Sequence, residues 1–445
     1  MSRWRPYPRY KNSGVEWLGK TPAHWSIQKL KHISSVEYSG VDKHKRDEEQ
    51  PVRLCNYVDV YYNDYITDDL ELMRATASTD EIKNFTLRGS DIIITKDSET
   101  WDDIAVPAYV PSDLEGVLCG YHLALIRPDE QIVSGKYLFR SFSARGINDQ
   151  FRVAANGITR YGLGKYWLEN SVFPVPSLPE QRAIAAFLDR ETARIDALVE
   201  KQERLIALLQ EKRAALISHA VTRGLDPDVV MKDSGTPWLG EIPAHWELVR
   251  LKFLTKKPLQ YGANEAAQIN DPDLPRYIRI TDISEDGSLR ENTFRSLPFE
   301  AAADYLLEPG DLLLARSGAT VGKSFMYQES WGTACYAGYL IRFRPDLTVV
   351  EPRFILYFVN SPAYWSWLSS IFIQATIQNV SAEKYANLLV PVPPLVEQRA
   401  IAAHLDRETA KTDALVAKAQ EIIGRLQEYR TALISAAVTG KIDVR

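Results

Sequence analysis

The chain has 445 residues, of which 45% are hydrophobic and 25% charged, so it is long enough for two or three domains and too apolar for wholesale disorder. Its formal net charge of −5 counts mildly against a nucleic-acid binder, because such domains are usually basic. The sequence contains no signal-peptide pattern, no membrane-length apolar run and no CxxC spacing, which favours a cytoplasmic protein without disulfides or a zinc site. Cys55, Cys119 and Cys335 are therefore expected to be core thiols.

The first motif in chain order occurs twice. "KNSGVEWLGKTPAHW", from Lys11 to Trp25, returns as "KDSGTPWLGEIPAHW", from Lys232 to Trp246, and we call this repeated stretch the frame motif. A repeat of this kind predicts that one structural part is used in two places. Each copy contains a histidine, His24 or His245, with no second metal ligand beside it, so a structural role is favoured over metal binding.

The first variable block, near residues 34–170, has the pattern of a mixed α+β domain. "DIIIT" (Asp91–Thr95) and "HLALIRP" (His122–Pro128) are expected to be strands, and "GKYLFRSFSA" an aromatic helix. Two of its loops contain side chains that can read bases or stack on them, since arginine suits guanine and asparagine suits adenine. The candidate DNA-binding residues in this block are Lys96, Ser98, Trp101, Asn156, Thr159, Arg160 and Tyr161.

The next element is a long helix that also occurs twice. "EQRAIAAFLDRETARIDALV" begins at Glu180 and "EQRAIAAHLDRETAKTDALV" at Glu397, and the stretches up to Thr222 and Thr439 agree at 30 of 43 positions. Apolar residues at alternating three- and four-residue steps predict a coiled-coil seam. The seam residues are Ile184, Leu188, Ile195, Leu198, Leu205, Leu209 and Leu216 in the first copy, and Ile401, Leu405, Leu415, Ile422, Leu426 and Leu433 in the second. We expect the two helices to pair antiparallel; the alternative is that each packs on its own domain.

The second variable block, near residues 255–385, shares the strand pattern of the first but differs in its loops. "DLLLA" (Asp311–Ala315) and "YLIRFRP" (Tyr339–Pro345) match the two strands predicted in the first block. A common scaffold with different loops is typical of a recognition module. Its candidate DNA-binding residues are Tyr261, Asn264, Arg316, Ser317, Lys323, Gln374, Thr376, Gln378 and Asn379.

No catalytic or metal-binding constellation is found. "SGATVGKS" (Ser317–Ser324) resembles a phosphate loop, but Ser317 stands where the motif requires glycine. A nuclease reading of Glu81 and Lys83 after Asp68–Asp69 has no counterpart in the second block, and the motifs of a DNA methyltransferase are missing. We therefore expect no catalytic residues, no metal site and no cofactor bound by this chain.

These observations predict two globular α+β recognition domains separated by a pair of long antiparallel coiled-coil helices, with a pseudo-twofold internal repeat. The expected segments are 1–176 for the first frame and recognition domain, 177–224 for the first long helix, 225–392 for the second frame and recognition domain, and 393–445 for the second long helix.

The combination resembles the specificity subunit of bacterial and archaeal type I restriction–modification enzymes. The resemblance rests on "GVEWLGKTPAHW", "LLEPGDLLLARSGATVGKS" and "QNVSAEKYANLLVPVPPLVEQ", and covers essentially the whole chain. The first block departs from it, because "TKDSETWDD" replaces the Arg-Ser-Gly loop. The resemblance implies that each block reads one half of a bipartite double-stranded DNA target and that the helices set the spacer between the halves.

The same resemblance implies partners. Two modification subunits would dock on the helices and use S-adenosylmethionine to methylate adenine, and restriction subunits that use ATP and Mg²⁺ can join them. Two other readings stay open on the residues alone: a coiled-coil scaffold whose blocks bind protein, and a nucleotide-using enzyme built on Lys323.

Overall fold

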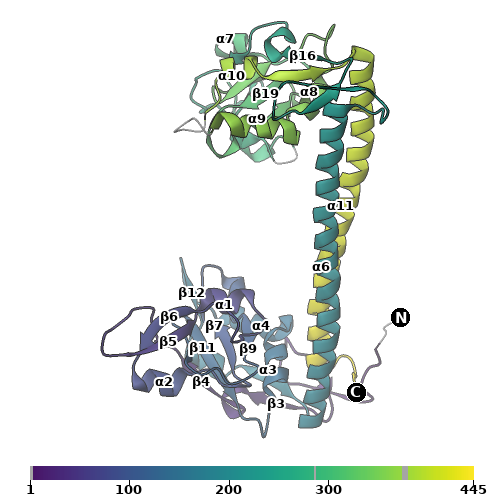
Figure 1. Ribbon diagram of the computed structural model, residues 1–445. Coiled ribbons are helices and arrows are strands. Elements are labelled where there is room, and N and C mark those ends of the chain that lie inside the picture. The colour runs from purple at the N-terminus through teal and green to yellow at the C-terminus, as the bar shows by residue number, and fades with distance from the viewer. Residues whose placement is uncertain (1–3, 285–286, 373–378) are drawn as a thin grey trace. The chain divides into compact units, whose positions relative to one another are not determined.

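The computed structural model describes residues 4–284, 287–372 and 379–445 (Figure 1). The chain forms two compact units, the first made of Met1–Glu203 with Gln420–Arg445, and the second of Arg204–Ala419. Each unit contains one copy of the frame motif, one variable block, and half of each long helix. Each is of the α+β class that the sequence predicts.

The first unit is built on a four-stranded antiparallel sheet in the order β4-β11-β7-β9. The predicted strands are confirmed as β7 (Ile92–Thr95) and β11 (Leu123–Pro128), which lie between β4 (Ser34–Tyr38) and β9 (Pro107–Tyr109). A second sheet in the order β10-β5-β6 contains Val117–Cys119, Gln50–Cys55 and Met73–Ala77. The helices of this block are α1 (Tyr57–Tyr62), α2 (Thr79–Phe85), α3 (Gly135–Phe142), α4 (Arg145–Ala154) and α5 (Lys165–Glu169).

The second unit repeats the same sheet order with different lengths of strand. Its four-stranded sheet runs β17-β22-β19-β20, formed by Gln260–Tyr261, Leu340–Phe343, Leu312–Ala315 and Ser324–Met326. A parallel pair, β18 (Arg276–Ile278) with β21 (Ala334–Tyr336), corresponds to β5 with β10. The helices are α7 (Phe299–Ala302), α8 (Pro352–Phe358), α9 (Pro362–Phe372) and α10 (Ala382–Ala386). The two blocks therefore share a scaffold although their loops differ.

The repeated frame motif folds in the same way in both units. In the first, β1 (Tyr10–Asn12) pairs with β2 (Lys20–Pro22), and β3 (Ser26–Lys29) pairs with β13 (Val172–Val175) just before the long helix. The second has β14 (Met231–Asp233) with β15 (Glu241–Pro243), and β16 (Glu247–Arg250) with β23 (Leu389–Val392).

The frame is joined to the long helix by the glutamate that starts the helix phrase. In the first unit, Glu180 lies 2.9 Å from His24 Nε2 and accepts a hydrogen bond from Trp25 Nε1 at 3.1 Å. In the second, Glu397 lies 2.8 Å from His245 Nε2 and accepts from Trp246 Nε1 at 3.1 Å. Both histidines thus contact a carboxylate, and within the described residues no group of three or more His, Cys, Asp and Glu side chains could hold a metal ion.

The glutamine that follows this glutamate holds the variable block. Gln181 accepts a hydrogen bond from the backbone N–H of Ser134 at 2.8 Å and donates to the carbonyls of Ile132 and Pro176. Gln398 makes the matching bonds to Glu351, Val349 and Pro393. These paired contacts give a physical reason for the repetition of the helix phrase.

The two long helices pair antiparallel within each unit. They span Leu178–Arg223 (α6) and Leu395–Val438 (α11). Arg430 Nε lies 3.0 Å from Asp196 in the first unit, and Arg213 Nε lies 3.1 Å from Asp413 in the second. From Asp196 to Arg213 the numbering rises by 17, and from Arg430 to Asp413 it falls by 17, so both units have the same register.

The helices also pack on the domain cores, so the two alternatives left open by the sequence occur together. In the first unit Ile184 of α6 and Val438 of α11 join the core that contains Phe142. In the second, Val221 and Ile401 join the core that contains Phe354. Full burial of one such aliphatic side chain contributes about 1.5–3 kcal/mol.

At three positions of the predicted seam, the residue that packs between the helices is the one that follows the predicted residue. Leu198, Leu205 and Leu415 are 40%, 44% and 52% exposed, whereas their neighbours Val199, Ile206 and Val416 are partly buried. Both members of each pair are apolar, and the pattern allows either a three- or a four-residue step after Ile195; the helix takes the longer one. The other predicted seam residues are buried or partly buried: Ile184, Leu188, Ile195, Leu209, Leu216, Ile401, Leu405, Ile422, Leu426 and Leu433.

Cys55, Cys119 and Cys335 are free and buried, and burial raises the pKa of the Cys335 thiol to about 12.

Among the described residues, no helix combines the length and apolar character needed to span a bilayer.

The ends of both long helices depend on glycine, and we expect unequal effects when each is replaced. Gly224 and Gly440 have φ of +79° and +73°, a region that favours glycine. A β-carbon at Gly440 would overlap the ring of Pro22, whereas one at Gly224 would lie 3.3 Å from Trp246. Gly440→Ala should destabilise its unit by about 2–3 kcal/mol and Gly224→Ala by about 1 kcal/mol. Hydrogen exchange of the two frame motifs measures both effects; equal losses would contradict the steric argument.

Candidate nucleic-acid interface

The candidate interface of each unit begins where the third strand of the four-stranded sheet ends. Lys96 follows β7, and Arg316 follows β19. The carbonyl of Lys96 accepts a hydrogen bond from Leu163 N at 2.8 Å, and that of Arg316 accepts one from Val380 N at 2.8 Å. These two basic residues therefore occupy corresponding positions in the two units.

A tyrosine lies beside each basic residue. Lys96 Nζ is 5.6 Å from the ring centroid of Tyr38, and Arg316 Cζ is 4.6 Å from that of Tyr261. Tyr38 and Tyr261 occupy the same place in their sheets, because Tyr38 pairs with Ala124 of β11 and Tyr261 with Ile341 of β22. Cations within about 6 Å of an aromatic face are attracted to it, so each ring fixes a positive charge at the sheet edge.

Tyr38 is a residue that the sequence analysis missed. It ends β4 in "EYSG", whereas Tyr261 ends β17 in "QYGA". An alignment of the two first strands would have found it, but the blocks share too few identities there for the match to stand out.

In the first unit the basic residue is partly neutralised. Lys96 Nζ is 2.7 Å from Asp97 Oδ2, and His122 Nδ1 is 2.8 Å from the same oxygen. Burial raises the pKa of Asp97, but hydrogen bonds from Lys96 and His122 outweigh it and hold that pKa below its usual range. Lys96 also lies 5.1 Å from the ring centroid of Tyr121, which is 49% exposed. Tyr121 is therefore a further candidate for contact with a base.

The structure brings the two predicted loops of the first block together. β12 (Tyr161–Gly162) pairs antiparallel with β8 (Asp97–Ser98). A hairpin closed by Asn156 and Gly162 projects Thr159 and Arg160 into solvent, with Ile158 94% exposed at its tip. Trp101 begins a 3-10 turn shortly after β8 in the sequence and is 54% exposed.

Ser98 differs from the other predicted residues of this block. It is buried, and its hydroxyl accepts a hydrogen bond from Thr100 N at 3.3 Å. Ser98 belongs to β8 and pairs with Tyr161 of the hairpin, so its role here is structural.

In the second unit Arg316, Ser317, Tyr261 and Asn379 form one cluster. Ser317 and Asn379 make an isolated β-bridge, and Arg316 Nε donates to Asn379 Oδ1 at 3.4 Å. The hydroxyl of Tyr261 accepts a hydrogen bond from Ala382 N at 2.9 Å. Asn264 is exposed on the loop after β17. Gln374, Thr376 and Gln378 lie outside the described residues.

Lys323 is not part of that cluster. It lines a cavity of about 1030 Å³ together with Arg213 of α6 and Arg353 of α8, and neither Arg316 nor Tyr261 borders this cavity. Of the acids in the nuclease hypothesis for the first block, Glu81 accepts hydrogen bonds from Ser78 N and Oγ as a helix cap.

The chemistry of both clusters suits contact with DNA. Each presents a cation and aromatic or amide side chains at a loop edge, and these groups can bind phosphate, stack on bases or pair with base edges. Their surroundings differ, with a projecting hairpin in the first unit and the Arg316–Asn379 pair in the second.

The family described as the type I restriction modification DNA specificity domain matches residues 25–207 and 245–423. The EcoBI specificity subunit of Escherichia coli is 24% identical over 71% of this chain and 68% of that protein. The putative MjaX specificity subunit of Methanocaldococcus jannaschii is 21% identical over 96% of each chain.

Solved structures agree with this fold. A chain from a study of complex assembly and conformational transition of the type I R-M system has a TM-score of 0.69 and 20% identity, covering 94% of this chain and 98% of that one. The HsdS subunit from Thermoanaerobacter tengcongensis gives a TM-score of 0.54 and 18% identity, covering 95% and 98%.

Proposed function

This chain belongs to the type I restriction–modification DNA specificity family, and we propose that each of its two units reads one half of a bipartite, asymmetric DNA target. The observation that carries the proposal is the pair of corresponding clusters, Lys96 with Tyr38 and Arg316 with Tyr261. They lie at the same strand ends of one scaffold, while the loops around them differ. Two recognition domains with the same scaffold but different side chains would recognise two different half-sites.

The proposal extends to partners. Modification subunits that use S-adenosylmethionine would dock on the paired helices and methylate adenine, so this chain would select the DNA and perform no chemistry. Contacts with phosphate account for much of the affinity of DNA-binding proteins. The net charge of −5 is compatible with DNA binding if the modification subunits supply part of those contacts.

Replacing Arg316 with alanine should relax recognition of one half-site only. Loss of one base-reading arginine costs about 1–3 kcal/mol, or roughly 5- to 150-fold in discrimination. Long-read methylation mapping in cells that carry the modification partners measures this, with a strain lacking the gene as the baseline. Lys96→Ala is the matched variant and should affect the other half.

Two outcomes would contradict the proposal. One is the same methylation pattern with and without the gene. The other is an Arg316→Ala variant that loosens both half-sites equally, because independent readers would not be coupled in this way.

A further inference from the structure

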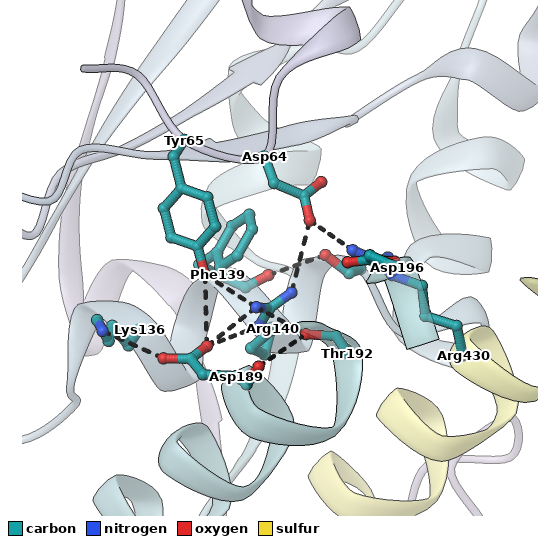
Figure 2. Close-up of polar contacts among 10 residues, drawn as sticks. Asp64, Tyr65, Lys136, Phe139, Arg140, Asp189, Thr192, Asp196 and Arg430 are labelled. Atoms are coloured by element: carbon teal, nitrogen blue, oxygen red, sulfur yellow. Dashed lines mark hydrogen bonds and ion pairs between the residues drawn. The ribbon is translucent and has the colours of Figure 1, made fainter. Parts of the chain in front are cut away.

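A buried arginine joins the first variable block to the long helix of its own unit (Figure 2). Arg140 of α3 is only 2% exposed. Its Nη2 donates to Asp189 Oδ1 of α6 at 2.9 Å and to the hydroxyl of Tyr65 at 2.9 Å. Because a buried guanidinium must be paired, this arrangement fixes α3 against α6.

One carboxylate extends the network to the last helix of the chain. Asp64, in the segment between α1 and β6, lies 2.6 Å from Arg430 Nη2 of α11 and 3.6 Å from Arg140 Nη1. Arg430 also contacts Asp196 of α6 at 3.0 Å, as Figure 2 shows. Arg140 Nη1 is buried and makes no hydrogen bond, so it depends on the nearby charge of Asp64. Asp64 thus connects the variable block directly with α11 and, through Arg430 and Arg140, with α6.

The second unit lacks this connection within its described part. Arg213 and Asp413 repeat the pair made by Arg430 and Asp196. Tyr357 stands at the position of Arg140 and donates to Asp406 Oδ1 at 2.7 Å. Among the described residues of this block, Arg213 has no further carboxylate partner, and it borders the cavity of about 1030 Å³ instead.

We propose that Asp64 is a positioning residue that fixes the angle of the first variable block on its helix pair and so restricts the spacer length that the protein accepts. This inference rests on the proposed function. The ion pair of Asp64 with Arg430 acts across the joint between the recognition domain and the helices, and the ion pairs of the Lys96 cluster do not involve Asp64. Loss of the charge at Asp64 would release the block from α11 and loosen its angle on the helix pair, while Arg140 and Asp189 still hold α3 on α6 and the residues that read bases stay the same.

The test uses the full chain assembled with its modification partners. Asp64→Asn keeps the shape and removes the charge, and binding is measured on duplexes whose spacer is native, one base pair shorter or one longer. The preference for the native spacer should fall by about tenfold, within the range of coupling energies in charged networks, while base preferences in both half-sites stay the same. Asp64→Glu should restore the preference. Asp413→Asn, which removes an ion pair between the two long helices of the second unit that includes no residue of a variable block, is the control and should leave the spacer preference unchanged.

Three results would overturn the proposal. Equal weakening on all three spacers would show that Asp64 only stabilises the fold. A preference unchanged from the wild type would show that the angle is set elsewhere. A wild-type complex that shows no sequence preference at all would refute the proposed function, which the first two results would leave standing.

Discussion

Replacing Glu180 with alanine is expected to destabilise the first unit by about 3–5 kcal/mol, because the variant leaves the fully buried indole N–H of Trp25 without its charged acceptor and removes the contact with the half-exposed His24. Glu180 is only 4% exposed, and its two oxygens contact His24 and Trp25. The indole ring of Trp25 is fully buried, so water cannot replace the lost acceptor. The frame motif would lose its attachment to α6.

Glu397 provides the matched control inside the same chain. It makes the same two contacts with His245 and Trp246, but its side chain is 31% exposed. Trp246 is as fully buried as Trp25, but water already reaches the Glu397 carboxylate and weakens its contacts, so Glu397→Ala should cost only about 1–2 kcal/mol. Hydrogen exchange of residues 20–30 and 241–251 in the two variants gives the comparison, since a chain with two units need not unfold in one step. Equal costs would mean that burial of the carboxylate does not set the strength of the attachment.

The sequence predicted those parts of the fold that depend on local pattern. Runs of isoleucine and leucine ended by turns identified β7 and β19, and the repeated phrase identified both long helices. The seam failed at Leu198, Leu205 and Leu415, because two adjacent apolar residues leave the helical phase undetermined and packing of the partner helix decides it.

The candidate interface was predicted less completely. Residues on both sides of a loop pairing, such as Arg316 and Asn379, were identified by residue type, but nothing in the sequence showed that the two segments meet. Asp64 was not identified at all. A single aspartate has no pattern, and its role depends on Arg140 and Arg430, which lie far away in the sequence.

Matched insertions of seven residues in both long helices should widen the accepted DNA spacer by about three base pairs. At 1.5 Å per residue, seven residues add about 10.5 Å to a helix, and duplex DNA rises about 3.4 Å per base pair. Seven residues also restore the heptad phase, so the seam continues through the insertion. The insertions belong between Asp196 and Arg213 on α6 and between Asp413 and Arg430 on α11, which leaves both ion pairs intact.

An insertion in one helix alone is the informative control. The two ion pairs, Asp196 with Arg430 and Arg213 with Asp413, lie 17 residues apart on both helices. An insertion lengthens this interval on one helix only, so the two pairs can no longer form together. We therefore expect the single insertion to lower the activity of the complex, whereas the matched pair keeps activity and changes the target. Methylation mapping distinguishes these results. An unchanged spacer in cells with the matched insertions would show that the helices do not measure the distance between the half-sites.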